Sequence, residues 1–97
     1  MTAAERDALI RGYFENECMG ILQAKGHDYA GNLDCLANLR RFGLFGIIVR
    51  LSDKFSRIEQ YAKAGELHVA DESVRDTLRD IVNYCLLGMI FLDEKDD

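Results

Sequence analysis

The most informative stretch of this chain is Glu72-Ser-Val-Arg-Asp76-Thr-Leu-Arg-Asp80-Ile-Val-Asn83-Tyr84. Its three acidic residues and its asparagine recur at i, i+4, i+8 and i+11, so on an α-helix they fall within an arc of roughly 80°. Another face of the same helix is apolar, and we expect this face to pack against the core. The residues of that apolar face are Val74, Leu78, Ile81, Val82, Cys85 and Met89. The stretch therefore predicts a long helix with an acidic face and an apolar face.

The acidic face has two interpretations. Carboxylate and amide oxygens are the ligands that a hard cation such as Mg²⁺ takes, so the face is a candidate metal site. Alternatively, it is a solvated surface on which Arg75 and Arg79 form weak ion pairs with the neighbouring acids. Leu87 and Ile90 project on the acidic side, so we expect something to cover that side and to place the carboxylates at the rim of a packed interface.

Apolar residues at helical spacing predict three further helices earlier in the chain. Thr2 and Glu5 form a capping-box pattern at the start of the first helix, and Gly65 is expected to end the third. The expected helices cover residues 2–25, 32–42, 47–64 and 71–92, with glycine-containing breaks at 26–31 and 43–46 and a frayed tail at 93–97. The core residues expected before the last helix are Leu9, Ile10, Phe14, Cys18, Ile21, Leu22, Leu33, Leu36, Leu39, Phe42, Ile47, Ile48, Leu51, Phe55, Ile58 and Ala62.

The length and the pattern predict one all-α domain. The chain has 97 residues, so residues 1–97 are expected to form a single four-helix bundle-like domain with two long and two shorter helices and a core at about 3–92. The long helices would each exceed roughly 30 Å, whereas a domain of this size has a radius of gyration of about 13 Å. We therefore expect a homo-oligomer, a dimer or tetramer, that covers the overhang; the alternative is an elongated monomeric bundle.

Charge and composition exclude several classes of function. The net charge is −5, which argues against binding of a nucleic acid polymer but leaves nucleotides open. The polar first residues and the lack of a long apolar run predict a cytoplasmic protein with no membrane association. Three scattered cysteines predict reduced thiols, and the two isolated histidines give no zinc pattern.

Two other polar clusters are candidate binding elements. Arg50, Asp53, Lys54 and Arg57 share one side of the third helix, and they form either a surface ion-pair ladder or a mixed site. In a mixed site, Asp53 would join the carboxylates of the last helix and the cations would meet phosphate oxygens. The segment 25–31 is either an ordinary helix-ending turn or a loop that contacts a nucleotide.

Three sequence blocks, in the order in which they occur in the chain, resemble those of a known family. Lys25-Gly-His-Asp28-Tyr29-Ala-Gly, Arg50-Leu-Ser-Asp53-Lys54-Phe-Ser-Arg57 and the stretch from Glu72 to Tyr84 resemble the nucleotide-modification-associated domain family common in bacteriophages. That family is similar to the MazG-like all-α nucleoside triphosphate pyrophosphohydrolases. The resemblance covers residues 20–92 and implies an oligomeric hydrolase that uses Mg²⁺ or Mn²⁺ to convert a ribo- or deoxyribonucleoside triphosphate into a monophosphate and pyrophosphate.

The resemblance also implies roles for single residues. Asp53, Glu72, Asp76 and Asp80 are the candidate metal ligands, and Asp53, Asp76 and Asp80 are the candidate catalytic residues, one of them a candidate general base. The remaining candidates face the nucleotide. Phosphates would meet Lys25, Arg50, Lys54 and Arg57; the base or sugar would lie near Asp28 and Tyr29; and Asn83 would hold a ligand or orient a carboxylate.

One departure from the MazG-like pattern keeps alternatives open. MazG-like enzymes carry Glu-x-x-Glu on one helix and Glu-x-x-Asp on the next, whereas this chain has Arg50-x-x-Asp53 and Asp76-x-x-x-Asp80. Glu15 or Glu17 could supply the missing ligand. Otherwise, the chain could bind fewer metals, or bind or sequester a nucleotide without hydrolysing it. A helical protein-interaction module is the third alternative. If the chain is phage-encoded, its compartment is the cytoplasm of the host cell.

Overall fold

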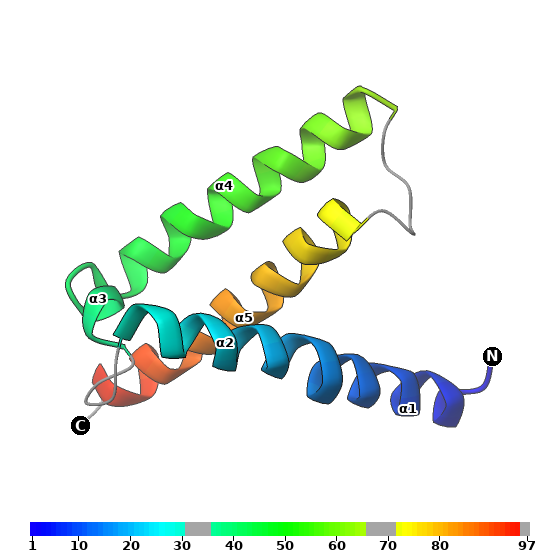
Figure 1. The fold of residues 1–97 in the computed structure, drawn as a ribbon, viewed down its shortest axis with the longest axis horizontal. Helices are drawn as coiled ribbons and strands as arrows, with labels where there is room; N and C mark the ends of the chain where they lie inside the picture. Colours follow the sequence, from blue (N-terminus) through cyan, green and yellow to red (C-terminus); the bar gives the residue numbers. More distant parts are fainter. Residues whose placement is uncertain (31–35, 66–71, 96–97) are drawn as a thin grey trace. The chain divides into compact units, whose positions relative to one another are not determined.

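The computed structural model describes residues 1–30, 36–65 and 72–95, and their side chains except those of residues 25–30, 38, 72 and 95 (Figure 1). Within these ranges every regular element is a helix and there is no strand, which confirms the all-α class. The chain forms two structural units, Met1–Cys35 and Leu36–Asp97. None of the helices in the described ranges is long and apolar enough to cross a membrane.

In the N-terminal unit, residues 3–30 form one continuous run of helical structure. It consists of α1 (Ala3–Tyr13), a π-helical turn η1 (Phe14–Cys18) and α2 (Met19–Ala30). The Thr2 hydroxyl oxygen accepts a hydrogen bond from the backbone N–H of Glu5 at 3.1 Å, so the predicted cap is confirmed. Such π-helical turns occur as single interruptions within α-helices, where they shift the register of the faces that follow.

Two expectations for this unit are wrong. The break expected at 26–31 lies partly within α2, which continues to Ala30. Glycine in a helix costs only about 1 kcal/mol relative to alanine, which ongoing backbone hydrogen bonds can outweigh. Leu9, Ile10 and Phe14 were expected in the core and are exposed, whereas Cys18 is buried as expected. Periodicity identifies the apolar side of a helix but not whether anything packs against it.

The C-terminal unit is a helical hairpin with a short helix before it. It contains α3 (Ala37–Arg40), α4 (Gly43–Lys63) and α5 (Glu72–Lys95). Helices α4 and α5 run antiparallel, as Figure 1 shows. The start of α4 packs on the later part of α5, where a Cβ on Gly88 would lie 3.6 Å from a methyl carbon of Ile47. The Arg40 guanidinium of α3 forms two hydrogen bonds with the Glu94 carboxylate, at 2.5 and 2.8 Å.

Glycines set both ends of α4. Gly43 has φ +60°, a conformation that non-glycine residues rarely adopt, and it starts the helix four residues before the expected position. The break expected at 43–46 is therefore wrong, because these residues form the first turn of α4. Gly65 has φ +71° just beyond the helix, so its predicted role as the stop is confirmed. The expected helix at 32–42 is described only from residue 36, and only Ala37–Arg40 of it is helical.

The buried face of α5 overlaps the predicted apolar face only in part: Val74 is buried and Ile81 is half-buried, as expected. Leu78, Val82, Cys85 and Met89 were expected in the core and are exposed. The buried residues of α5 are Val74, Thr77, Asp80, Asn83, Gly88 and Phe91. The helix turns this mixed face to α4, because the contacts of Asp80 and Gly88 are on that side. The expectation that something covers the acidic side is thus confirmed for Asp80 and Asn83.

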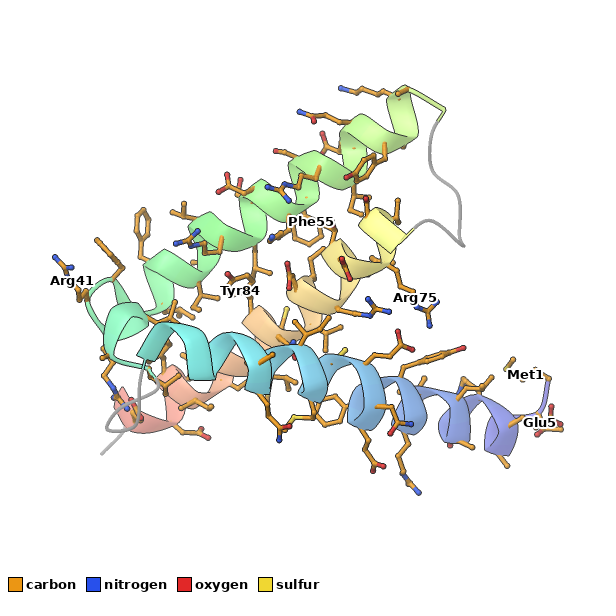
Figure 2. The ribbon with its side chains drawn as sticks, in the orientation of Figure 1. Met1, Glu5, Arg41, Phe55, Arg75 and Tyr84 are labelled. Carbon is orange, nitrogen blue, oxygen red and sulfur yellow. The ribbon has the colours of Figure 1, made fainter. Side chains whose placement is uncertain are left out.

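Helix α4 follows its predicted core pattern in part. Ile47 is buried, and Leu51 and Ile58 are half-buried, as expected. Ile48 and Phe55 (labelled in Figure 2) are exposed, which corrects their assignment to the core. Ala62 is exposed as well. The core of the hairpin is therefore narrow, and apolar side chains of both helices remain on its surface.

Replacing Gly46 with alanine tests the close approach in the first turn of α4. A Cβ on Gly46 would lie 2.7 Å from Cβ of Phe42, an atom that cannot move without the backbone. We expect Gly46→Ala to lower the free energy of unfolding by about 1–2 kcal/mol, because the overlap outweighs the gain in helix propensity.

Gly20→Ala is the matched control, because a Cβ on Gly20 meets nothing within 4 Å. It should be neutral or raise stability by up to about 1 kcal/mol. Urea unfolding followed by circular dichroism measures both variants. Equal effects of the two substitutions would contradict the close approach.

Candidate functional site

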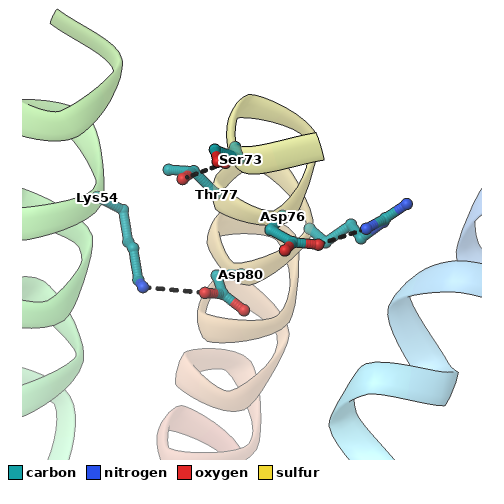
Figure 3. Close-up of polar contacts among 6 residues, drawn as sticks. Lys54, Ser73, Asp76, Thr77 and Asp80 are labelled. Atoms are coloured by element: carbon teal, nitrogen blue, oxygen red, sulfur yellow. Dashed lines mark hydrogen bonds and ion pairs between the residues drawn. The ribbon is translucent and has the colours of Figure 1, made fainter. Parts of the chain in front are cut away.

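A buried polar stripe on α5 is the main chemical feature of the C-terminal unit. Thr77, Asp80 and Asn83 are spaced three residues apart and are only 3%, 8% and 6% exposed. The Thr77 hydroxyl donates a hydrogen bond to the backbone carbonyl of Ser73 at 2.9 Å, one turn earlier in the same helix (Figure 3). Polar side chains are seldom buried unless they are hydrogen-bonded or charge-paired. The polar side chains of the stripe therefore need hydrogen-bonding or charged partners. Asp80, the charged residue of the stripe, has such a partner on α4.

That partner is Lys54. Its ammonium nitrogen lies 2.9 Å from Oδ2 of Asp80, and Figure 3 shows the contact crossing from α4 to α5. The two side chains are only 16% and 11% exposed. Low exposure strengthens the attraction between the charges and also makes each charge costly when its partner is removed. The pair therefore fixes the register of the two helices at this height.

A second ion pair lies beside the first, within α5. Nη1 of Arg79 lies 2.5 Å from Oδ1 of Asp76, three residues earlier (Figure 3). The Asp76 side chain is 56% exposed, whereas that of Arg79 is 14% exposed. This pair is the kind that the solvated-surface interpretation predicted for Arg79. Figure 2 shows Arg75 on the side of α5 turned away from α4.

Asn83 continues the stripe one turn beyond Asp80. Its amide oxygen is buried and accepts no hydrogen bond from the described part of the chain, although the residue itself has another interaction. A carboxamide oxygen can accept two hydrogen bonds or serve as a ligand of a hard cation. The sequence singled out Asn83 on spacing alone, and its burial beside Asp80 places it with the polar stripe.

The other candidates on α4 lie around Lys54 and are exposed. Arg50 and Arg57 are one turn before and one turn after Lys54, on the same side of the helix. Asp53 is exposed and, among the described residues, makes no ion pair. The structure therefore brings Lys54 and Asp80 together and leaves the two arginines as exposed cations flanking them.

Four candidates cannot be placed by their side chains. Lys25, Asp28 and Tyr29 lie in the last turns of α2, and Glu72 is the first residue of α5; the side chains of all four are outside the described part. Their assignments to phosphates, to the base or sugar and to a metal remain predictions.

The predicted metal ligands fit Mg²⁺ by chemistry but not by arrangement. Their oxygen donors are those that Mg²⁺ takes. Within the described residues, however, no three acidic, histidine or cysteine side chains come close enough to hold a metal ion together. Asp80 is paired with Lys54, Asp76 with Arg79, and Asp53 is on an exposed part of α4. The described side chains would have to exchange partners before a metal could be held by more than one of them.

Sequence reasoning missed two features here. Thr77 is buried in the stripe, and its position three residues before Asp80 is the signal that would have placed it there. The second is a shallow hollow along α4 lined by Ile48, Leu51, Ser52, Phe55, Ser56 and Glu59. These residues share one helix face, but spacing alone interprets such a face as core.

A comparison with protein-family models identifies the family to which the chain belongs. The family model described as nucleotide modification associated domain 1 matches residues 25–92. The match spans most of the chain and includes α3, α4 and most of α5, so the chain belongs to this family. No curated protein and no solved structure matches the chain.

The stability of the hairpin should depend on the Lys54–Asp80 pair. Lys54→Met keeps an unbranched side chain but removes the ammonium group that lies beside the largely buried Asp80 carboxylate. We expect it to lower the free energy of unfolding by about 2–4 kcal/mol, because a buried charge that loses its partner is strongly destabilising.

Arg40→Gln is the control, because the Arg40–Glu94 pair also joins two helices but is 43% and 39% exposed. Its loss should cost no more than about 1 kcal/mol. Urea unfolding compares the two variants, and a Lys54→Met effect no larger than that of Arg40→Gln would contradict a structural role for the buried pair.

Proposed function

We propose that the chain binds a nucleoside triphosphate beside the α4–α5 interface and, with Mg²⁺ or Mn²⁺, hydrolyses it to a monophosphate and pyrophosphate. The observation that carries the proposal is the buried Lys54–Asp80 pair, flanked on α4 by Arg50 and Arg57. Membership of a family described as nucleotide modification associated supports a nucleotide as the ligand. The resemblance of the sequence blocks to MazG-like enzymes supports the reaction.

The residues divide by charge into two groups that suit the two parts of such a ligand. Arginine can bind phosphate oxygens through two hydrogen bonds, and lysine acts as a point charge, so Arg50, Lys54 and Arg57 are the proposed phosphate contacts. Asp53, Glu72, Asp76 and Asp80 remain the proposed oxygen donors for the metal. Hydrolysis would break the bond between the α-phosphorus and its bridging oxygen, with water supplying the new oxygen. We assign no step to the metal, because the described carboxylates are not gathered around one point.

A non-catalytic nucleotide-binding module is the second candidate. The observation that favours it is that Asp76 and Asp80 are each already paired with a cation, Arg79 and Lys54. A site of this kind would hold or sequester a nucleotide and release it unchanged. Thermal stabilisation of the protein by nucleotides, with no product formed, would separate this function from hydrolysis.

Substituting Asp80 tests hydrolysis directly. Wild-type protein incubated with a panel of ribo- and deoxyribonucleoside triphosphates and Mg²⁺ or Mn²⁺ should give a monophosphate and pyrophosphate, separated by anion-exchange chromatography. Asp80→Asn should lower turnover by at least about 100-fold, because the amide has no charge to offer a cation. The substitution also takes the carboxylate away from Lys54, so turnover is compared at a temperature at which circular dichroism shows that the variant is folded.

Asp93→Asn is the control for this experiment. Asp93 is an exposed carboxylate on α5, more than three turns of helix from Asp80, and its variant should keep wild-type turnover. Full activity of Asp80→Asn would show that the assignment of Asp80 is wrong. Wild-type protein that binds nucleotides but forms no product would favour the second candidate.

We also propose that the chain forms a homo-oligomer, a dimer or tetramer with bundle-like packing. Large apolar side chains of α5 support this proposal, because Leu78, Val82 and Met89 are 51%, 40% and 60% exposed. Side chains of this size on one helix face are more typical of an interface than of a solvated surface.

The oligomeric state follows from light scattering coupled to size-exclusion chromatography. Wild-type protein should elute at a multiple of its 11.0 kDa chain mass. The double variant Leu78→Lys/Met89→Lys should have a lower molar mass than the wild-type assembly. The two lysine charges would be buried in the interface between subunits, which is unfavourable. A wild-type protein with the mass of one chain would contradict the proposal.

A further inference from the structure

Helix α4 carries an exposed apolar face that is separate from the proposed nucleotide site. Three large side chains of this face, Phe45, Ile48 and Phe55, are 73%, 54% and 53% exposed. Ser52 and Glu59 lie on the same face at helical spacing and are exposed as well. Large apolar side chains gathered on one helix face are typical of an interface. The question is which partner this face fits.

The five residues have the spacing of a coiled-coil seam. Phe45, Ser52 and Glu59 follow one another at intervals of seven residues. Ile48 and Phe55 lie between them, so the steps alternate between three and four residues. This alternation keeps one stripe of a helix turned to a partner helix over several turns. Four of the five residues also line the shallow hollow on α4, so this stripe, the α4 seam, has a recess beside its large side chains.

The α4 seam is complementary to itself when a second copy of α4 runs antiparallel. If the two helices cross at the height of residue 50, Phe45 of each copy lies opposite Phe55 of the other. In the same register, Ile48 of each copy lies opposite Ser52 of the other, so a large side chain faces the recess above a small one. Two aromatic pairs then flank two such contacts, and the two-fold symmetry makes every contact occur twice.

Charge complementarity favours this direction and this register. Glu59 of one copy would lie at the N-terminal end of α4 of the other copy, where a helix carries a partial positive charge. Figure 2 shows Arg41 at that end of α4, and its guanidinium lies over the Phe42 ring, 5.8 Å from the ring centroid. In a parallel pair, the two Glu59 carboxylates would instead face each other within the seam, which like charges oppose.

We infer that the α4 seam binds the α4 seam of a second copy of this chain in an antiparallel pair. Its charged contacts are Arg41 of each copy with Glu59 of the other. The inference goes beyond the proposed function, because the seam is separate from the nucleotide site and from the α5 face proposed as an interface. A chain that used both the seam and the α5 face would form a tetramer with two kinds of two-fold contact.

Disulfide trapping tests the pairing and its register. Phe45→Cys/Phe55→Cys is made in a chain that carries Cys18→Ala, Cys35→Ala and Cys85→Ala. The two new thiols of one chain are about 15 Å apart along the helix, too far to join within that chain. After oxidation with copper–phenanthroline, non-reducing electrophoresis should show a covalent dimer of twice the 11.0 kDa chain mass. Each single variant should stay at the mass of one chain, because equal positions of the two copies are also about 15 Å apart in this register.

Charge reversal tests the ends of the pair in a chain that keeps its cysteines. Glu59→Arg brings two cations together, so it should raise the dissociation constant measured by light scattering at least about tenfold. Arg41→Glu/Glu59→Arg restores opposite charges and should recover most of that loss. Asp53→Arg is the matched control, because it reverses an exposed acid on another side of α4 and should leave the dissociation constant unchanged.

The outcomes separate this contact from the α5 interface. Trapping of the single variants at the level of the double variant would overturn the inference, and so would a Glu59→Arg chain that associates as wild type does. Dissociation by Leu78→Lys/Met89→Lys, with no trapping of Phe45→Cys/Phe55→Cys, would overturn the inference while the α5 proposal stands. A wild-type protein with the mass of one chain would overturn both self-contacts and leave the proposed nucleotide site untouched.

Discussion

The buried ion pair between Lys54 and Asp80 is the constraint on which the C-terminal unit depends. It joins the middle of α4 to α5. The side of α5 that faces α4 there carries both polar and apolar side chains. Burying this side sets the rotation of α5 and so turns Leu78, Val82 and Met89 outward. This contact therefore helps to explain why polar side chains of α5 are buried while apolar side chains of the same helix are exposed. Either charge without the other would make this packing unfavourable.

The same contact links the fold to the proposed chemistry. Exposed arginines beside Lys54 extend the positive side of the proposed site along α4, and Asp76 extends its negative side along α5. Substitution of Lys54 or Asp80 would therefore change both the packing of the hairpin and the charge of the proposed site.

Much of the local structure could be predicted from the sequence. The Thr2 cap, the stop at Gly65, the long helices and the all-α class all follow from short-range chemistry, which acts within a few residues. The candidate site was predicted in part: spacing placed Asp80 and Asn83 on one face, and the apolar residues beyond them indicated that this face is covered. The same spacing could not show that Lys54 would be the group that meets Asp80, because 26 positions of chain separate them and only packing brings them together.

Local sequence signals predict most of the helical segments and which residues share a helix face, because capping, glycine conformations and a period of 3.6 residues are local properties. Tertiary structure decided which face is buried. For α5, hydrophobicity favoured the side with Leu78 and Met89, whereas the hairpin buries the side with Thr77, Asp80 and Asn83. Tertiary structure also decided that Asp80 faces an ammonium group. The free energy of a buried charge depends on what lies across the interface, and a single helix sequence carries no information about that neighbour.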